Sequence, residues 1–136
     1  PNSTRPWQHV LEPLSGYLVL AQKLFDNPIE FSQGWNFGPK EEDVRPVKWI
    51  VEKMSSNWPQ SSWELEKDVQ PHEADFLKLD ISKARLGLNW SPTWSLEKSL
   101  KKIITWHQSW MNKQNIQYVC LDEINEYMED MNNEKY

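Results

Sequence analysis

The feature that most limits the fold is the helical spacing of apolar residues in segments separated by short, proline-rich stretches. From Glu12 to Phe25 apolar side chains recur at the i, i+3, i+4 spacing of an amphipathic helix, with Pro13 in the first turn and Asp26-Asn27-Pro28 as the stop. The same reasoning predicts four further helices, over residues 47–54, 83–86, 96–110 and 122–131.

Short polar residues and prolines mark the expected ends of these helices. Asp43 is expected to cap the second helix, with Pro46 in its first turn, and Ser95 to cap the long fourth helix. Ser82 is expected to open the short third helix and Gly87 to end it. The long helix should bury a stripe formed by Leu96, Leu100, Ile103, Ile104, His107 and Trp110.

Three short strands are predicted between the helices, over residues 34–38, 62–67 and 76–79. They are too few and too short to close a sheet of their own. Either they form a small sheet packed on helices, or some are edges of a sheet completed by further chain. We therefore predict a mixed, helix-rich α/β fold, with residues 1–136 forming one domain.

Composition fits a soluble globular protein. The chain has 136 residues, 38% of them hydrophobic, and its net charge of −5 argues against a nucleic-acid backbone as partner. No apolar run is long enough to span a bilayer, and no signal peptide is recognisable. The single cysteine, Cys120, forms no internal disulfide and indicates a reducing cytoplasm. The abrupt start, without an initiator methionine, is interpreted as the mark of a piece of a longer chain.

The tryptophan content is high, with nine in 136 residues. Tryptophan brings a large apolar area with one N–H donor. It serves either to fill a thin core or to stack against flat and sugar-like ligands, and the sequence leaves both uses open.

Motifs of self-contained enzymes are missing from the sequence. There is no Gly-rich phosphate loop, no Gly-x-Ser-x-Gly, no His-Glu-x-x-His and no Cys-x-x-Cys, and no tyrosine is followed by lysine four residues later. The three histidines are far apart in the sequence, so a zinc site is not expected. We predict no catalytic, cofactor-binding or metal-ligating residue in this chain.

The first candidate for ligand binding is the stretch just before the first helix. Arg5 offers a fork of donors for a phosphate, and Pro6 stiffens the backbone that aims it. Trp7 provides a flat wall beside this charge, while Gln8 and His9 add neutral donors. The alternative is a surface arginine beside a tryptophan of the core.

The second candidate is the loop ahead of the strand at 76–79. His72 is able to donate to a phosphate or ribose oxygen, and Glu73 to accept from a pair of hydroxyls. The alternative is a solvated polar loop.

Residues 79–97 are explained mostly by structural roles. Asp80 and Ser82 have the placement of helix caps, and Trp90 and Trp94 that of packing residues. The lysines of the following helix, Lys98, Lys101 and Lys102, are expected to face water.

These residues together resemble the CDP-glucose 4,6-dehydratases of the extended short-chain dehydrogenase/reductase superfamily. The resemblance spans about residues 2–110 and, more weakly, 121–127. It rests on short motifs that occur in the same order as in the family: Arg5 to Leu18 (Arg-Pro-Trp-Gln-His-Val onward), Trp35 to Pro39, Asp43 with Arg45 to Val47, Pro71 to Ala74, Leu79-Asp80, Ser82 to Ala84, and Trp94 to Glu97. Gly87 to Trp90 departs from the family's commoner Leu-Gly-Trp turn.

The resemblance implies a lyase that uses NAD. It implies that C4 of the sugar is oxidised, that water leaves across C5 and C6, and that hydride returns to C6. The product would be CDP-4-keto-6-deoxyglucose, a precursor of dideoxysugars in bacterial surface polysaccharides such as lipopolysaccharide O-antigen. In this superfamily the N-terminal Rossmann half holds NAD and the catalytic residues, whereas the C-terminal half supplies the sugar-nucleotide pocket.

The chain resembles only that C-terminal half, so residues 1–136 are expected to bind substrate and to be inactive alone. The strand around Asn36 would complete the Rossmann sheet of the parent. By resemblance, Arg5 would lie against the diphosphate, Trp7 beside the nucleotide, and His72 and Glu73 within reach of it. CDP-glucose is the expected partner, and a homo-oligomer is possible.

Two other functions fit the sequence. One is a related epimerase or dehydratase acting on another nucleotide sugar, since the residues that select the base are not identified. The other is a separate tryptophan-rich module that binds carbohydrate or a partner helix.

Overall fold

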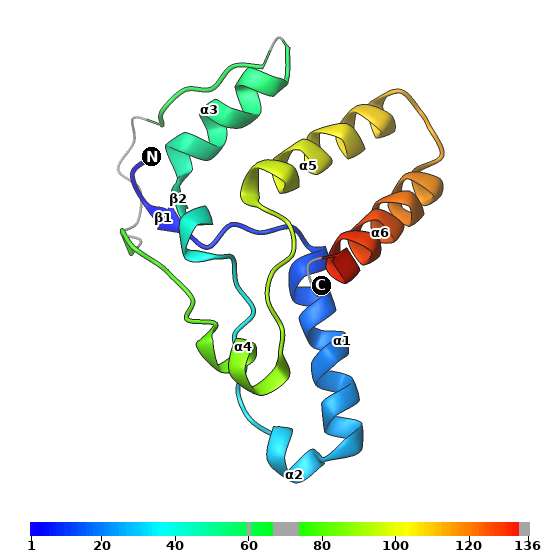
Figure 1. Ribbon diagram of the computed structural model, residues 1–136. Coiled ribbons are helices and arrows are strands. Elements are labelled where there is room, and N and C mark those ends of the chain that lie inside the picture. The colour runs from blue at the N-terminus through cyan, green and yellow to red at the C-terminus, as the bar shows by residue number, and fades with distance from the viewer. Residues whose placement is uncertain (60, 67–73, 134–136) are drawn as a thin grey trace.

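The computed structural model describes residues 1–59, 61–66 and 74–133. These residues form six helices, one turn of 3-10 helix and two strands of two residues each, arranged as in Figure 1. In chain order they are β1 (Thr4–Arg5), α1 (Leu11–Asp26), α2 (Pro28–Phe31), the 3-10 turn (Glu41–Asp43), β2 (Arg45–Pro46), α3 (Val47–Asn57), α4 (Ser82–Leu88), α5 (Leu96–Met111) and α6 (Ile116–Asn133).

The two strands form a small antiparallel sheet, in which Thr4 faces Pro46 and Arg5 faces Arg45. The chain near Phe76 joins the other side of β1 through an isolated parallel bridge to Thr4. Thr4 N–H donates to the carbonyl of Asp75 at 2.8 Å, and Leu77 N–H donates to the carbonyl of Thr4 at 3.1 Å. Segments far apart in the sequence are thus joined at β1.

The prediction of three strands was wrong within the described residues. Residues 34–38 and 62–66 have no regular secondary structure, Lys67 lies outside the described residues, and of 76–79 only Phe76 forms a bridge. The apolar pattern at 34–38 reports burial, since Phe37 is 7% exposed. Alternation predicts which face is buried but supplies no hydrogen-bonded neighbour, and a strand needs one.

The predicted helices are confirmed, with corrections at their ends and to the buried stripe of α5, in which His107 and Trp110 are exposed. The first is α1, but the chain continues after Asn27 into the short helix α2, which was not predicted. Helix α4 passes through Gly87 and ends at Leu88, and its C-cap residue Asn89 takes the left-handed conformation (φ 52°) in place of the expected glycine. Helix α6 begins six residues before Asp122, because Asn115 accepts from Gln117 N–H at 3.1 Å.

Asp43 and Pro46 do not have the positions predicted for them at the start of α3. Asp43 belongs to the 3-10 turn, and its carboxylate accepts from Leu96 N–H at 3.0 Å, so it binds the start of α5 and not of α3. Pro46 precedes α3 as part of β2. Ser95 caps α5 as predicted, accepting from Lys98 N–H at 3.3 Å.

The core has two parts. One lies among α1, α2 and α4 and consists of Phe31, Phe37, Ala84, Leu88 and Trp90. The other joins α3 to α5 and consists of Ile50, Leu96 and Leu100, with Trp7, Trp49 and Met54 packed against it. Trp90 and Trp94 are both 4% exposed, so these two tryptophans fill the core as predicted.

Candidate functional site

Arg5 lies at the centre of the small sheet, in β1. Its Nη1 donates to the carbonyl of Thr4 at 2.9 Å and to the carbonyl of Ala74 at 2.8 Å. Ala74 directly follows Glu73 in the sequence. The structure therefore fixes the Arg5 guanidinium against the segment that carries the second candidate pair. His72 and Glu73 themselves lie outside the described residues.

Trp7 is half-buried two residues further on. Its indole N–H donates to the carbonyl of Arg45 at 3.1 Å, and its ring packs on the α3–α5 core. These contacts match the core-tryptophan alternative and tie β2 to the chain that leads into α1. A contact between Trp7 and a nucleotide stays a prediction.

Gln8 and His9 point to other parts of the molecule. Gln8 Nε2 donates to the carbonyl of Phe37 at 2.9 Å, and its Oε1 is buried with no hydrogen-bond partner in the described part of the chain. His9 is 4% exposed and faces α6, where its Nε2 lies 3.8 Å from Glu123 Oε1. The motif from Arg5 to Val10 is therefore divided between two places, the small sheet around Arg5 and the contact of His9 with α6.

A cavity of about 560 Å³ adjoins the small sheet. Two residues of its wall are next to residues of the sheet in the sequence. Val44 directly precedes Arg45, which faces Arg5 in the sheet. Lys78 directly follows Leu77, whose N–H donates to the carbonyl of Thr4. The wall is formed by Pro39, Lys40, Glu41, Glu42, Val44, Lys78, Leu79, Asp80, Ile81, Ser82, Arg85, Ser91 and Pro92. The cavity is thus lined by several residues of the motifs that carry the family resemblance.

Charges of both signs line this cavity. Lys78 Nζ pairs with Glu41 at 2.9 Å, and Asp80 accepts from Ser82 N–H at 2.8 Å. The N-cap residue of α4 is Ile81, so Asp80 binds the first helical residue from one position before the cap. The hydrogen bonds from Ser82 lower the pKa of Asp80. The Arg85 side chain forms no hydrogen bond or ion pair with the rest of the described chain, which leaves its donors available to an anion. No role was predicted for Arg85 from the sequence.

A buried carboxylate that the sequence analysis missed joins α1 to the chain before α5. Glu12 is fully buried and accepts from Thr93 N–H at 2.9 Å, Trp94 N–H at 2.7 Å and the Tyr127 hydroxyl at 2.7 Å. Burial raises the pKa of the Tyr127 hydroxyl. The available signal was an acidic residue in the first helical turn, which also fits a surface position.

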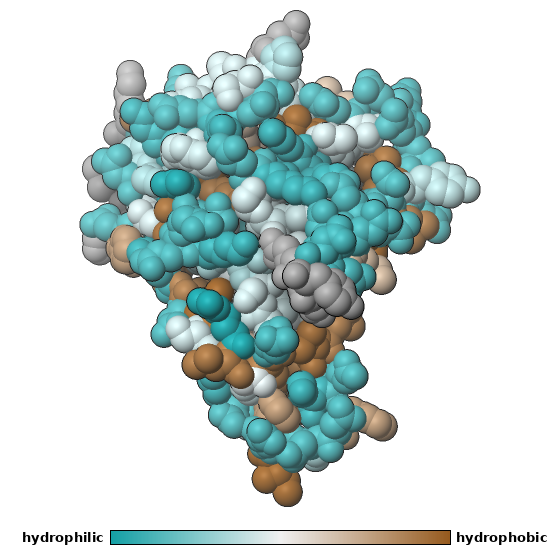
Figure 2. All heavy atoms as spheres, viewed as in Figure 1, coloured by the Kyte–Doolittle hydropathy of each residue, from teal (hydrophilic) through white to brown (hydrophobic). Residues whose placement is uncertain are grey.

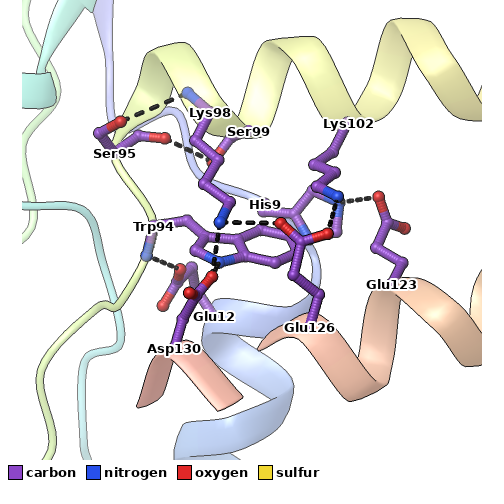
Figure 3. A network of polar contacts seen from close by, with 10 residues as sticks. All are labelled: His9, Glu12, Trp94, Ser95, Lys98, Ser99, Lys102, Glu123, Glu126 and Asp130. Atoms are coloured by element: carbon purple, nitrogen blue, oxygen red, sulfur yellow. Dashed lines mark hydrogen bonds and ion pairs between the residues drawn. The ribbon is translucent and has the colours of Figure 1, made fainter. Parts of the chain in front are cut away.

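The prediction that the three lysines of α5 face water was wrong for two of them, which point to α6 (Figure 3). Lys98 Nζ pairs with Glu126 at 2.9 Å and with Asp130 at 2.5 Å, and Lys102 also pairs with Glu126. Asp130 additionally accepts from the indole N–H of Trp94 at 2.6 Å. Hydrogen bonds from Lys98 and Trp94 lower the pKa of Asp130. Of the three, Lys101 is exposed, whereas Lys98 and Lys102 are partly buried.

Within residues 1–59, 61–66 and 74–133, no three His, Cys, Asp or Glu side chains are placed to hold a metal ion. None of the helices in the same ranges has the length and apolar character needed to cross a membrane.

Comparison with known proteins gives one informative result. No family model matches the chain. The sequence is 49% identical over 129 residues to a CDP-glucose 4,6-dehydratase from Salmonella typhimurium. This match covers 94% of the present chain but only 36% of the Salmonella enzyme. The chain is therefore homologous to a region of a CDP-glucose 4,6-dehydratase that makes up about a third of that enzyme.

Proposed function

We propose that this chain is the substrate-binding part of a CDP-glucose 4,6-dehydratase that acts in the cytoplasm on the route to dideoxysugars. The observation that carries this proposal is the 49% identity over nearly the whole chain. The contact between Arg5 and Ala74 supports the proposal, because this contact joins the two segments that, by the family resemblance, carry nucleotide-binding residues.

In this proposal the Arg5 guanidinium stabilises the diphosphate of CDP-glucose. The bonds from Nη1 to Thr4 and Ala74 fix the plane of the guanidinium, so less side-chain entropy is lost when an anion binds. Trp7 holds the neighbouring backbone and flanks the nucleotide. His72 and Glu73 hydrogen-bond the nucleotide from the loop that Ala74 ends.

NAD does not fit the described residues of this chain. The sequence has four glycines and no Gly-rich phosphate loop, and the strands are two residues long and antiparallel. We therefore place NAD, and every catalytic residue, in a region of the parent enzyme outside the part matched here. The segment at 34–38 would pair with the Rossmann sheet of that region, and the chain alone would not turn over substrate.

Calorimetric titration tests the proposal. CDP-glucose and CDP are expected to bind with the same order of affinity, and UDP to bind more weakly. Tighter binding of UDP or GDP would favour another nucleotide-sugar enzyme. Binding of uncharged glucose with no preference for a nucleotide would favour the tryptophan-rich module.

Two arginines of the small sheet form a matched pair for this titration. Arg5→Ala should weaken CDP-glucose binding by about tenfold or more, as expected for the loss of a charge-assisted contact to phosphate. Arg45→Ala removes the same charge from the facing strand position, where Arg45 stacks on Trp49 at 5.5 Å. Equal weakening by both variants would show long-range charge attraction and contradict a contact by Arg5.

The same substitution has a kinetic signature in the complete enzyme. Arg5→Ala should raise KM more than it lowers kcat, because it removes binding that the ground state and the transition state share. An unchanged KM in steady-state assays with CDP-glucose would exclude the assigned role.

A further inference from the structure

A second cavity, of about 310 Å³, lies between the start of α1 and the pair α5–α6. It shares no lining residue with the cavity beside the small sheet. Its wall is formed by His9, Val10, Leu11, Ile103, Trp106, His107, Cys120, Glu123 and Ile124. The proposed function uses none of these residues.

The wall is mainly apolar and carries aromatic faces. Leu11, Ile103 and Ile124 provide aliphatic surface from three helices. The rings of Trp106 and His107 lie edge to face, with centroids 5.1 Å apart. Aromatic faces and edges of this kind favour planar aromatic ligands over flexible polar ones.

Trp106 and His9 direct their polar ring atoms toward other residues at this cavity. Trp106 Nε1–H donates to the sulfur of Cys120 at 3.3 Å. His9 Nδ1 accepts from Leu11 N–H at 3.3 Å, which places the proton of the neutral ring on Nε2, facing Glu123 at 3.8 Å. Burial, with a smaller contribution from Lys102, lowers the pKa of His9 to about 4, so the ring is neutral at neutral pH.

Glu123 is a polar group of the wall with unused hydrogen-bonding capacity. Its side chain is 15% exposed, and it accepts no hydrogen bond from any described residue. A carboxyl group has about four acceptor sites, and His9 offers a proton to one of them from beyond hydrogen-bond distance. A ligand that enters this cavity satisfies Glu123 only if it brings a donor.

We propose that this cavity binds a small planar heteroaromatic molecule that donates a ring N–H to Glu123. The volume is sufficient for a two-ring compound, so indole is a suitable probe. Benzothiophene is a matched control ligand, because it has nearly the same shape but no N–H.

Cys120 provides the readout, since it is the single cysteine of the chain and lines this cavity. Its alkylation by iodoacetamide can be followed by intact mass in the presence of each probe. Indole should slow alkylation at saturating concentration and should bind about fivefold more tightly than benzothiophene, the ratio expected for one net hydrogen bond.

Two variants on α6 locate the contact. Glu123→Met should remove the preference for indole over benzothiophene, whereas Glu129→Met, at an exposed position on the same helix, should keep it. The amide shifts caused by indole should lie at the lining residues, which checks that each variant remains folded. Absence of protection by either probe, equal affinity for both, or shifts confined to another surface would overturn the proposal.

Discussion

Glu12 shows how one buried charge organises the centre of the molecule. Its carboxylate accepts hydrogen bonds from the backbone N–H groups of Thr93 and Trp94 and from the Tyr127 hydroxyl, so three segments meet at one side chain. A buried carboxylate is stable only when such donors surround it. The loss of a single acceptor oxygen should therefore be costly.

Glu12→Gln is expected to lower the free energy of unfolding by about 3 kcal/mol, because the new amide group turns a donor toward the backbone N–H of Thr93 or Trp94. Urea denaturation followed by circular dichroism measures the change. Glu129→Gln, at an exposed position outside the network of Figure 3, should change stability by less than about 0.5 kcal/mol. Equal effects would contradict the role of Glu12.

His9 predicts a loss of stability in mild acid. Its pKa is lowered to about 4 in the folded chain, while an unfolded histidine titrates near the ordinary value of 6.5. Between these values the unfolded chain binds the extra proton, so stability falls as the pH drops from about 6.5 to 4, by up to about 3 kcal/mol. Glu123, whose pKa burial raises, opposes part of this fall.

Urea titrations at several pH values measure this slope. His9→Gln should be less stable at neutral pH but should show a flatter pH dependence over the same window, because glutamine does not titrate. A slope unchanged by the substitution would exclude His9 as its source.

At the scale of residues, the sequence singled out Arg5 as a candidate and left a core role for Trp7 open, but it did not predict the bond from Arg5 to Ala74 or the roles of Glu12, Lys98 and Lys102. Residue type and spacing predict which side chains are able to bind an anion. They do not predict which polar group the fold brings near, because those partners lie 24 to 115 positions away in the chain.

At the scale of elements, Gly16 marks the closest approach of α1 to the irregular segment that contains Phe37. A Cβ at Gly16 would lie 2.5 Å from Phe37 Cε1 and 2.8 Å from Cγ, and the Phe37 ring is itself held between Tyr17 and Trp90. Gly34, in the same irregular segment, has no atom within 4 Å of such a Cβ. The two glycines therefore form a matched pair.

Gly16→Ala is expected to destabilise the chain by about 2 kcal/mol, because displacement of the Phe37 ring outweighs the gain of about 1 kcal/mol in helix propensity. Gly34→Ala should be neutral or slightly stabilising, since it restricts only the unfolded chain. Thermal unfolding of both variants measures the difference. A stabilised Gly16→Ala variant would mean that α1 and Phe37 pack less closely than the structure shows.

The elements also show why helices were predicted better than strands. A helix satisfies its backbone within one segment, so spacing and caps such as Ser95 define it locally. A strand depends on a neighbour that local sequence does not name. The β1–β2 pair illustrates this, because it joins residues about 40 positions apart that carry no strand pattern.

At the scale of the whole molecule, apolar side chains remain exposed along α1, α2 and α4. Phe25 is 89% exposed and Ile29 93%, and Figure 2 shows apolar residues gathered at the lower end of the molecule, where Figure 1 places α2. Leu14, Tyr17 and Leu18 of α1 and Leu86 of α4 are also exposed, each by at least 45%. A surface of this kind favours association in water.

The chain alone is therefore expected to self-associate as its concentration rises, which sedimentation velocity measures. Ile29→Lys should reduce this association, and Gln33→Lys, which adds the same charge at an exposed position four residues on, should not. Because the chain carries a net charge of −5, either lysine lowers the repulsion between copies. A fall in association confined to Ile29→Lys thus comes from the lost apolar contact, and a monomeric unsubstituted chain at all concentrations would show that this surface stays solvated.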